Sequence, residues 1–321
     1  MTVSSGDSFL GSADPAPAVG SADPAVAPPD LGPTLVAANA AGVLEHPGLD
    51  SNPYLIDADG RPYVPIGDGG VVLGVALGDS VFGFDADHAS PAVSVAHPDP
   101  AARFALTVFA CLGNPVTVRT GAAAGAVGAV LGKRGDSTRV LAWFPAEVTA
   151  VLIPGDAVAV RTRGQGARLP EPIAALGGQL LNVDPALLPA LGVTVTADSV
   201  RVEVRGRVGS KLIGNGIGRP AHQWDLDLQV DAGSAAALGL SGLRLGDLVG
   251  VQDLDVRHNT GFRRGWVTVG VVVTTTSPRP GHGVGLMPIL CLPQEVVTLD
   301  VQPEHHIGVT TELLTAAAGG L

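Results

Sequence analysis

One phrase recurs along the chain and limits the folds that it can adopt: a Gly-Asp pair followed by a run of mostly apolar residues. The pair occurs at Gly78-Asp79, Gly155-Asp156 and Gly246-Asp247. Glycine supplies the backbone geometry of a tight turn, aspartate hydrogen-bonds to its own turn, and a run of period two enters a sheet. Such phrases are typical of barrels and sandwiches of short strands. We therefore predict a mainly β fold with short helices (α+β), organised as two barrel-like or sandwich-like β-rich domains.

The composition agrees with short strands joined by many turns. The 321 residues include 44 Gly and 26 Pro, yet 46% of the chain is hydrophobic, so the glycine and proline content indicates ordered turns rather than a disordered chain. Aromatic residues make up only 4%. The core must therefore be built from valine, leucine, isoleucine and alanine, and the valine content favours strands.

The chain divides into a tail and two halves. Residues 1–33 consist largely of Ala, Pro, Ser, Gly and Asp and contain Gly-Ser-Ala-Asp-Pro-Ala twice, at 11–16 and at 20–25. This segment has too few apolar groups to offset its ordering entropy, so we predict a disordered tail. Prolines and a glycine pair between residues 170 and 198 indicate a boundary. We expect an N-terminal domain at 34–185 and a C-terminal domain at 186–321.

The charge excludes some classes of partner. Asp and Glu number 30 and Lys and Arg 19, which gives a formal net charge of -11. An acidic protein repels a phosphate backbone and an anionic membrane, so we expect no nucleic-acid or membrane partner. Cys111 and Cys291 lie far apart and suggest no disulfide framework, and no apolar run is long enough to span a membrane. A cytoplasmic protein with a small-molecule ligand is the expectation, and a homo-oligomer stays open.

A glycine-rich stretch in the first half has the spacing of a known loop. Gly121, Gly125 and Gly128 suit a tight connection between two strands, and the spacing resembles a short motif of ribosomal and transcription-elongation small barrels. Those proteins carry Lys and Arg between the glycines, whereas this chain has mainly alanine. We expect the loop geometry without RNA binding.

Pairs of aspartates in the second half are the main candidates for chemistry. Residues two apart on a strand face the same way, so Asp225 with Asp227 and Asp253 with Asp255 would each present two carboxylates together. Such pairs repel unless they share a proton or bind a cation. His282 stands between two glycines, where its ring is open to a ligand. We predict that these four aspartates and His282 form one catalytic site.

A metal and a substrate site are part of the same hypothesis. Asp253, Asp255 and His258 are the candidate ligands of a divalent metal ion, although the identity of any cofactor is unknown. The glycine-rich segment 209–218 could expose amide donors to an anion, and the predicted substrate-binding residues are Lys211, Asn215, Gly216 and Arg263. The alternative is that the aspartates cap turns and the glycines form a strained turn.

The order of these phrases resembles a known family. From residue 35 to residue 300 the chain has a collinear set that is specific as a whole, although each member alone is weak. It includes Asp87-His88, Cys111-Leu-Gly-Asn114, Asn182-Val-Asp-Pro185, Gly214-Asn-Gly-Ile-Gly218, Asp225-Leu-Asp227 and Gly281-His-Gly283. This set is similar to an uncharacterised two-domain family, the domain of unknown function 4438, which has separate N- and C-terminal parts. The resemblance implies two domains and brings no assigned activity.

Two functions remain open from the sequence. The first is an enzyme that acts on a small polar metabolite, by metal-assisted hydrolysis or cyclisation at an amide or related carbonyl, because Asp, His, Lys and glycine loops concentrate in the second half. The second is a non-catalytic protein that binds a small anion or serves a structural or assembly role. The lack of a recognisable spacing between a nucleophile and a base favours the second.

Overall fold

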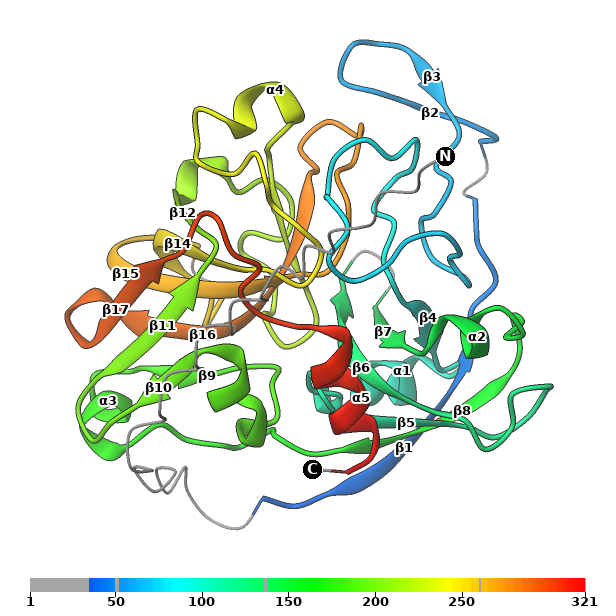
Figure 1. Ribbon diagram of the computed structural model, residues 1–321, viewed down its shortest axis with the longest axis horizontal. Helices are drawn as coiled ribbons and strands as arrows, with labels where there is room; N and C mark the ends of the chain where they lie inside the picture. The colour runs from blue at the N-terminus through cyan, green and yellow to red at the C-terminus, as the bar shows by residue number, and fades with distance from the viewer. Residues whose placement is uncertain (1–34, 50–51, 136–137, 260, 321) are drawn as a thin grey trace, which may run out of the picture.

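The computed structural model describes residues 35–49, 52–135, 138–259 and 261–320. The tail predicted at 1–33 lies outside these residues. Within them the protein is mostly β with a few short helices, as predicted. Figure 1 shows the chain returning at its C-terminal end to the strands of its first half.

The first half forms a closed barrel of six strands. The strands are β1 (Ala38–Leu44), β4 (Val93–Ala96), β5 (Pro115–Val118), β6 (Val127–Arg134), β7 (Arg139–Trp143) and β8 (Ala157–Thr162), arranged in the order β1-β4-β7-β6-β5-β8. Valines with almost no exposure, among them Val93, Val116 and Val160, fill its interior. β5 and β6 pair across the predicted glycine loop, and Gly155-Asp156 directly precedes β8 as expected. Valine and alanine thus make up most of this interior, which also takes in leucines and Phe144.

The second half is built on two further sheets. The larger runs in the order β12 (Gly206–Gly209), β14 (Leu248–Asp255), β15 (Gly261–Val272), β16 (Val284–Pro293), β13 (Leu226–Leu228), and β9 (Gln179–Leu180) also pairs with β16. The smaller comprises β10 (Val193–Val195), β11 (Val200–Val204) and β17 (Val297–Val301). Every residue of β16 is buried. Gly246-Asp247 leads into β14. Gly78-Asp79 leads only to an isolated bridge between Ser80 and Arg244, so the strand predicted after this pair is wrong.

The remaining elements are short. The two-stranded sheet pairs β2 (Leu55–Ile56) with β3 (Pro62–Tyr63). The helices are α1 (Pro100–Phe109), α2 (Ala146–Thr149), α3 (Glu171–Ala175), α4 (Ala232–Ala235) and α5 (Thr311–Ala318), with 3₁₀ turns η1 (Pro185–Leu187), η2 (Pro189–Leu191), η3 (Ser210–Leu212) and η4 (Gln294–Val296). No helix in the described parts of the chain combines the length and the apolar character that crossing a membrane requires.

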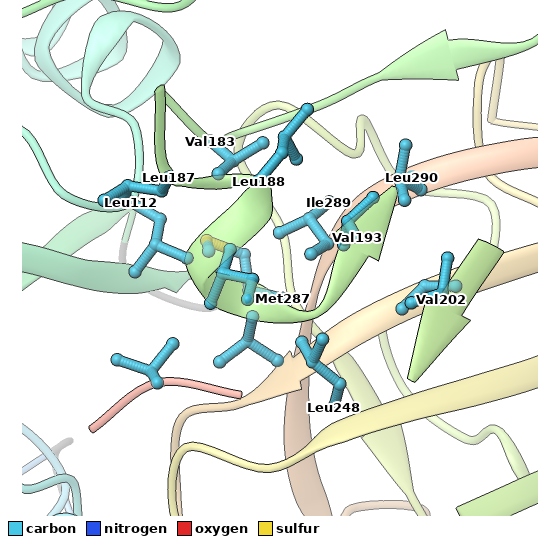
Figure 2. Close-up of a cluster of buried hydrophobic side chains, with 14 of the residues drawn as sticks. Leu112, Val183, Leu187, Leu188, Val193, Val202, Leu248, Met287, Ile289 and Leu290 are labelled. Atoms are coloured by element: carbon cyan, nitrogen blue, oxygen red, sulfur yellow. The ribbon is translucent and has the colours of Figure 1, made fainter. Parts of the chain in front are cut away.

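One hydrophobic core joins the two halves. Leu112 and Leu131 of the first half belong to the same buried cluster as Val269 and Ile289 of the second. Figure 2 shows Leu112 gathered with Leu187, Met287 and Ile289. Leu314 of α5 is part of this cluster as well, so the last helix closes the core against the barrel. The halves therefore share buried apolar surface and are expected to unfold together.

The segment between β3 and β4 leaves the barrel and pairs with the second half. The amide of Ala89 donates to Thr275 Oγ1 at 3.0 Å, and the amide of Thr275 donates back to the Ala89 carbonyl at 2.8 Å. The amide of His88 donates to the Thr276 carbonyl at 3.2 Å. In Figure 1 this segment, drawn in cyan, lies beside the orange chain that follows β15. The pairing carries residues of the first half into the second.

A buried lysine crosses the same boundary. Lys133 on β6 has no exposed surface, and its Nζ donates to Asn182 Oδ1 at 2.7 Å, to the His222 carbonyl at 2.9 Å and to the Val108 carbonyl at 3.3 Å. No carboxylate among the described residues pairs with it. Burial lowers the pKa of Lys133 to about 8. The neutral acceptors thus satisfy its protons without compensating its charge.

We predict that Lys133 makes the stability depend on pH in the alkaline range. Between pH 8 and the ordinary lysine pKa of 10.5, the unfolded chain keeps a proton that the folded chain has lost, so folding becomes more favourable as the pH rises. The free energy of unfolding of the wild type, measured by urea denaturation, should therefore increase over this range relative to that of Lys133→Met. The exposed Lys211→Met serves as the control, and its difference from wild type should stay constant. A constant difference for Lys133→Met as well would contradict the prediction.

Candidate functional site

Two histidines and an aspartate from three separate segments bring their polar atoms together. His282 Nδ1 lies 2.9 Å from Asp227 Oδ2 and 3.1 Å from His88 Nε2, and His88 Nε2 lies 3.9 Å from the same Asp227 oxygen. The two rings meet nearly edge to face, with centroids 5.3 Å apart. His88 and Asp227 are buried, and His282 is half-buried. Among the described residues, this trio is the group of His, Cys, Asp and Glu that could hold a metal ion.

The backbone around each of the three residues is fixed by neighbouring segments. Asp227 lies on β13, where its amide donates to the Asn215 carbonyl at 3.0 Å and its carbonyl accepts from Gly214 at 2.8 Å. His282 lies in the loop before β16, and its amide donates to the Arg279 carbonyl at 3.0 Å. His88 has a φ of 52°. That left-handed conformation is uncommon outside glycine and marks a residue held by its surroundings.

The environment of His88 keeps its ring neutral. Burial, reinforced by the charges of Arg134, His282 and Arg279, holds the pKa of His88 well below its ordinary value. Its Nδ1 lies 3.3 Å from Thr274 Oγ1. A neutral ring whose Nδ1–H donates to this hydroxyl turns the lone pair of Nε2 toward Asp227 and His282, as a metal ligand requires.

Asp87 adds a second carboxylate at the edge of the trio. Its Oδ2 accepts from the Tyr63 hydroxyl at 3.0 Å and lies 3.5 Å from Arg279 Nη2. Burial and the nearby Asp87 raise the pKa of Tyr63 to about 12, so the phenol stays protonated and donates. Asp87 Oδ1 is buried, lies 3.9 Å from His88 Nε2 and has no hydrogen-bond partner among the described residues. A cation beside His88 would balance this oxygen.

The distances within the trio suit ligands of one metal ion. Two ligand atoms that each lie about 2.1 Å from zinc stand about 3.0 Å apart at a right angle and about 3.4 Å apart at the tetrahedral angle. Of the three separations, 3.1 Å lies within this range, 2.9 Å lies just below it, and 3.9 Å lies above it and corresponds to a wider angle at the ion. Two imidazoles and one carboxylate suit zinc, iron or another divalent transition metal, with positions left for water or substrate.

His282 of the trio lines a cleft of about 520 Å³. Its walls come from both halves of the chain and include Asp68, Arg139, Asn215, Arg219, Trp224, Arg279 and His282. Asp68 forms ion pairs with three arginines. It pairs with Arg134, its Oδ1 lies 3.2 Å from Arg139 Nη1, and its Oδ2 lies 3.7 Å from Arg279 Nη2. Other hollows are comparable in size, but this one combines His282 with several cations. We take it as the candidate active-site cleft.

The structure brings together part of the predicted catalytic set. Asp225, Asp227 and His282 lie in one region, and Asn215 lines the cleft beside them. Asp225 is buried and accepts from the Gly135 amide at 3.1 Å. Both its Oδ2 and Thr274 Oγ1 would lie within 2.7 Å of a Cβ built on Gly285. Asp225 therefore supports the packing around Thr274, which in turn contacts His88.

The other predicted aspartates lie at the far end of the sheet, which corrects the prediction of one common pocket. Asp255 contacts Cys291 Sγ at 3.6 Å, and Cys291 lies seven residues along β16 from Val284, near which His282 stands. At about 3.3 Å per residue this is about 23 Å. Repulsion between nearby carboxylates is avoided here by neighbouring cations rather than by convergence on one metal.

The predicted metal ligands in that region have protein partners. Asp255 binds Arg257 at 2.9 Å and Arg263 at 3.0 Å, and Arg257 and Arg263 both lie over the ring of Trp266. Burial opposes the charge of Asp255, but the bonds from the two arginines outweigh it and lower its pKa. Asp253 Oδ1 accepts from the Gly265 amide, and His258 is exposed. The predicted metal site of Asp253, Asp255 and His258 is thus a structural ion-pair cluster, to which Arg263 belongs.

The glycine-rich segment serves packing rather than exposed amide donors. Its Gly214 and Asn215 amides donate to the carbonyls of Asp227 and Gly281, both at 2.8 Å. A Cβ on Gly216 would lie 2.1 Å from the Asp225 carbonyl oxygen. Lys211 is exposed in η3, outside the cleft lining. Neither Lys211 nor Gly216 lines the cleft with Asn215, so the predicted grouping of these residues is corrected, and the glycines let this segment pack against β13.

Sequence reasoning left His88 and the arginines of the cleft out of the site. Asp87-His88 is visible in the sequence, but nothing local indicates that it joins a pair of residues in the other half. Arg139 and Arg279 resemble ordinary surface cations until the fold turns them toward Asp68. The signal that could have found His88 is its adjacency to a carboxylate within a turn-rich segment.

Comparison with known proteins adds a family and a fold. Two family models of the domain of unknown function DUF4438 match the chain. The model of the N-terminal domain matches residues 54–189, and the model of the C-terminal domain matches residues 190–310. A solved structure described as "Crystal structure of TM1086" is similar, with a TM-score of 0.79 and 31% identity over 85% of this chain and 95% of that chain. No curated protein matches the chain.

We predict that replacement of aspartate by asparagine has different effects in the two motifs. Asp227→Asn should weaken zinc binding at least about tenfold, because it removes an anionic ligand. Asp255→Asn should leave zinc binding unchanged but lower the stability at neutral pH, because the pKa of Asp255 is depressed in the folded state and its contribution is present above pH 3.8. That loss should shrink as the pH falls below 3.8.

Zinc titration calorimetry and urea denaturation of both variants test this prediction. Circular dichroism checks that Asp227→Asn is folded. Equal zinc binding by Asp227→Asn and wild type, or weaker zinc binding by Asp255→Asn, would contradict it.

Proposed function

Since this chain belongs to the DUF4438 family, whose two domains have no assigned activity, we propose from its own site that it is a divalent-metal-dependent enzyme. Its reaction is hydrolysis or cyclisation at an amide or related carbonyl of a small polar metabolite. The observation that carries the proposal is the convergence of His88, Asp227 and His282, the last of which lines a polar cleft.

The donor set favours catalysis over a purely structural metal. Structural zinc sites are closed by four protein ligands, whereas catalytic sites use three and leave a position for water or substrate. The trio supplies three ligands, and His282 also lines the cleft. An ion held there would have its remaining positions toward a space that a small metabolite can enter.

The residues around the trio suit hydrolysis. His88, Asp227 and His282 would hold the ion, which would supply a water of lowered pKa. Asp87 Oδ1, 3.9 Å from His88 Nε2, would accept the proton that this water releases. The water oxygen would bond to the carbonyl carbon, the C–N bond would break, and the nitrogen would leave with the proton held by Asp87. Cyclisation is the reverse sequence, in which a substrate amine attacks and water departs.

A non-catalytic anion-binding protein is the second candidate. The arginines that converge on Asp68 favour it, since a cationic cleft binds an anion with or without a metal. This candidate predicts ligand binding without turnover and without a need for metal.

A metal-reconstitution experiment separates the two. We expect full-length protein that has been stripped by a chelator to regain activity with zinc, manganese or ferrous iron on a panel of linear and cyclic amides, followed by NMR. His282→Ala should lower kcat/KM at least about 100-fold, because it removes a ligand. His258→Ala, an exposed histidine away from the trio, is the control and should behave as wild type. No metal retention combined with no metal-dependent turnover would refute the enzyme proposal.

A further inference from the structure

The cleft is cationic although the protein as a whole is acidic. Arg139, Arg219 and Arg279 all line it, while the whole chain has a formal net charge of -11. Arg139 and Arg279 are engaged with Asp68, and Arg139 also lies 3.0 Å from Glu45. These pairs fix the positions of two of the three arginines. Three arginines and one aspartate line the cleft, so its wall would attract an anionic ligand.

Arg219 differs from the other two. Its guanidinium carbon lies 4.8 Å from the ring centroid of Trp224, and its side chain is exposed. No carboxylate among the described residues forms an ion pair with it. Trp224 is itself fixed, because its ring packs so closely on Gly135 that a Cβ there would lie 2.1 Å from it. Arg219 is thus supported on one face by a fixed ring, with its donor edge available to a ligand.

This arrangement is suited to a planar anion. A guanidinium presents parallel N–H donors that match a carboxylate in a bidentate pair, and stacking on an aromatic ring holds that plane in place. Arg219 lines the same cleft as His282, so a carboxylate bound to it would belong to a molecule that also reaches the trio. The cleft volume of about 520 Å³ is in the range of small-metabolite sites.

We infer that Arg219, supported by Trp224, binds a carboxylate of the ligand, so that the substrate class is small carboxylic acids bearing the reacting carbonyl elsewhere in the molecule. The description of the bound molecule as a substrate rests on the proposed function, whereas the carboxylate site itself needs no metal. Arg139 and Arg279 add positive charge around the bound anion, and Arg219 provides its direct contact.

The test is binding of succinate and of its neutral diamide, succinamide, measured by calorimetry on the full chain with and without zinc. Wild type should bind succinate more tightly than succinamide. Arg219→Ala should weaken succinate binding at least about tenfold, or about 1.4 kcal/mol, and leave succinamide unchanged. Arg219→Lys should lie between them, because lysine keeps the charge but loses the bidentate geometry. The exposed Arg207→Ala on β12 is the matched control and should bind as wild type.

Acetate, citrate and inorganic phosphate are titrated in the same way, and four results would overturn the inference. The first two are equal succinate binding by Arg219→Ala and wild type, and equal binding of succinate and succinamide by wild type. The other two are tighter binding of inorganic phosphate than of acetate, succinate or citrate, and failure of all three carboxylates to bind wild type. Zinc content is measured on the same samples. Zinc binding without dependence on Arg219 refutes only this inference, whereas carboxylate binding that depends on Arg219 in a protein without zinc affinity refutes only the metal enzyme.

Discussion

The pairing of residues 88–90 with residues 273–276 is the contact on which the candidate site depends. Three backbone amides and the hydroxyls of Ser90 and Thr275 hold these segments together, and the Ser90 hydroxyl donates to the Val273 carbonyl at 2.8 Å. The exchange places His88 against Thr274 and within 3.9 Å of Asp227. Because these bonds are buried, breaking them would leave polar groups unsatisfied, so the two halves are held in one register. Without this pairing His88 would not join Asp227 and His282, and Asp87 would not lie beside them.

Similar Asp-x-Asp motifs have different roles because their neighbours differ. Asp255 is buried with two arginines, and its charge is satisfied within the protein. Asp227 is buried with two histidines, one of which is kept neutral by its surroundings. His282 Nδ1 lies 2.9 Å from Asp227 Oδ2, and a metal ion held by the trio would add positive charge beside this buried carboxylate. The difference between a structural and a candidate functional aspartate is therefore electrostatic and lies in the tertiary contacts.

The positions of the cleft arginines also depend on tertiary contacts with a carboxylate. Asp68 orders three guanidinium groups in a protein whose formal net charge is -11. Arg219 stays exposed beside this network, supported by an aromatic ring. Together with the trio, the cleft combines a candidate ion site with cations for an anionic molecule, which neither half of the chain contains alone.

The class of fold follows from the sequence alone, because glycine, proline and aspartate turns between valine-rich runs are local signals that act within a few residues. Two of the three Gly-Asp phrases lead into strands, and the family resemblance was confirmed by the domain models. The sequence also singled out Asp227 and His282, because a same-face pair and a glycine-flanked ring are local patterns. Only the tertiary structure decided that His88 joins them and that Asp253 and Asp255 do not. Those outcomes depend on which distant segments pair and which arginines are nearby, and neither the long-range pairing nor the burial of a charge is encoded in the spacing of neighbouring residues.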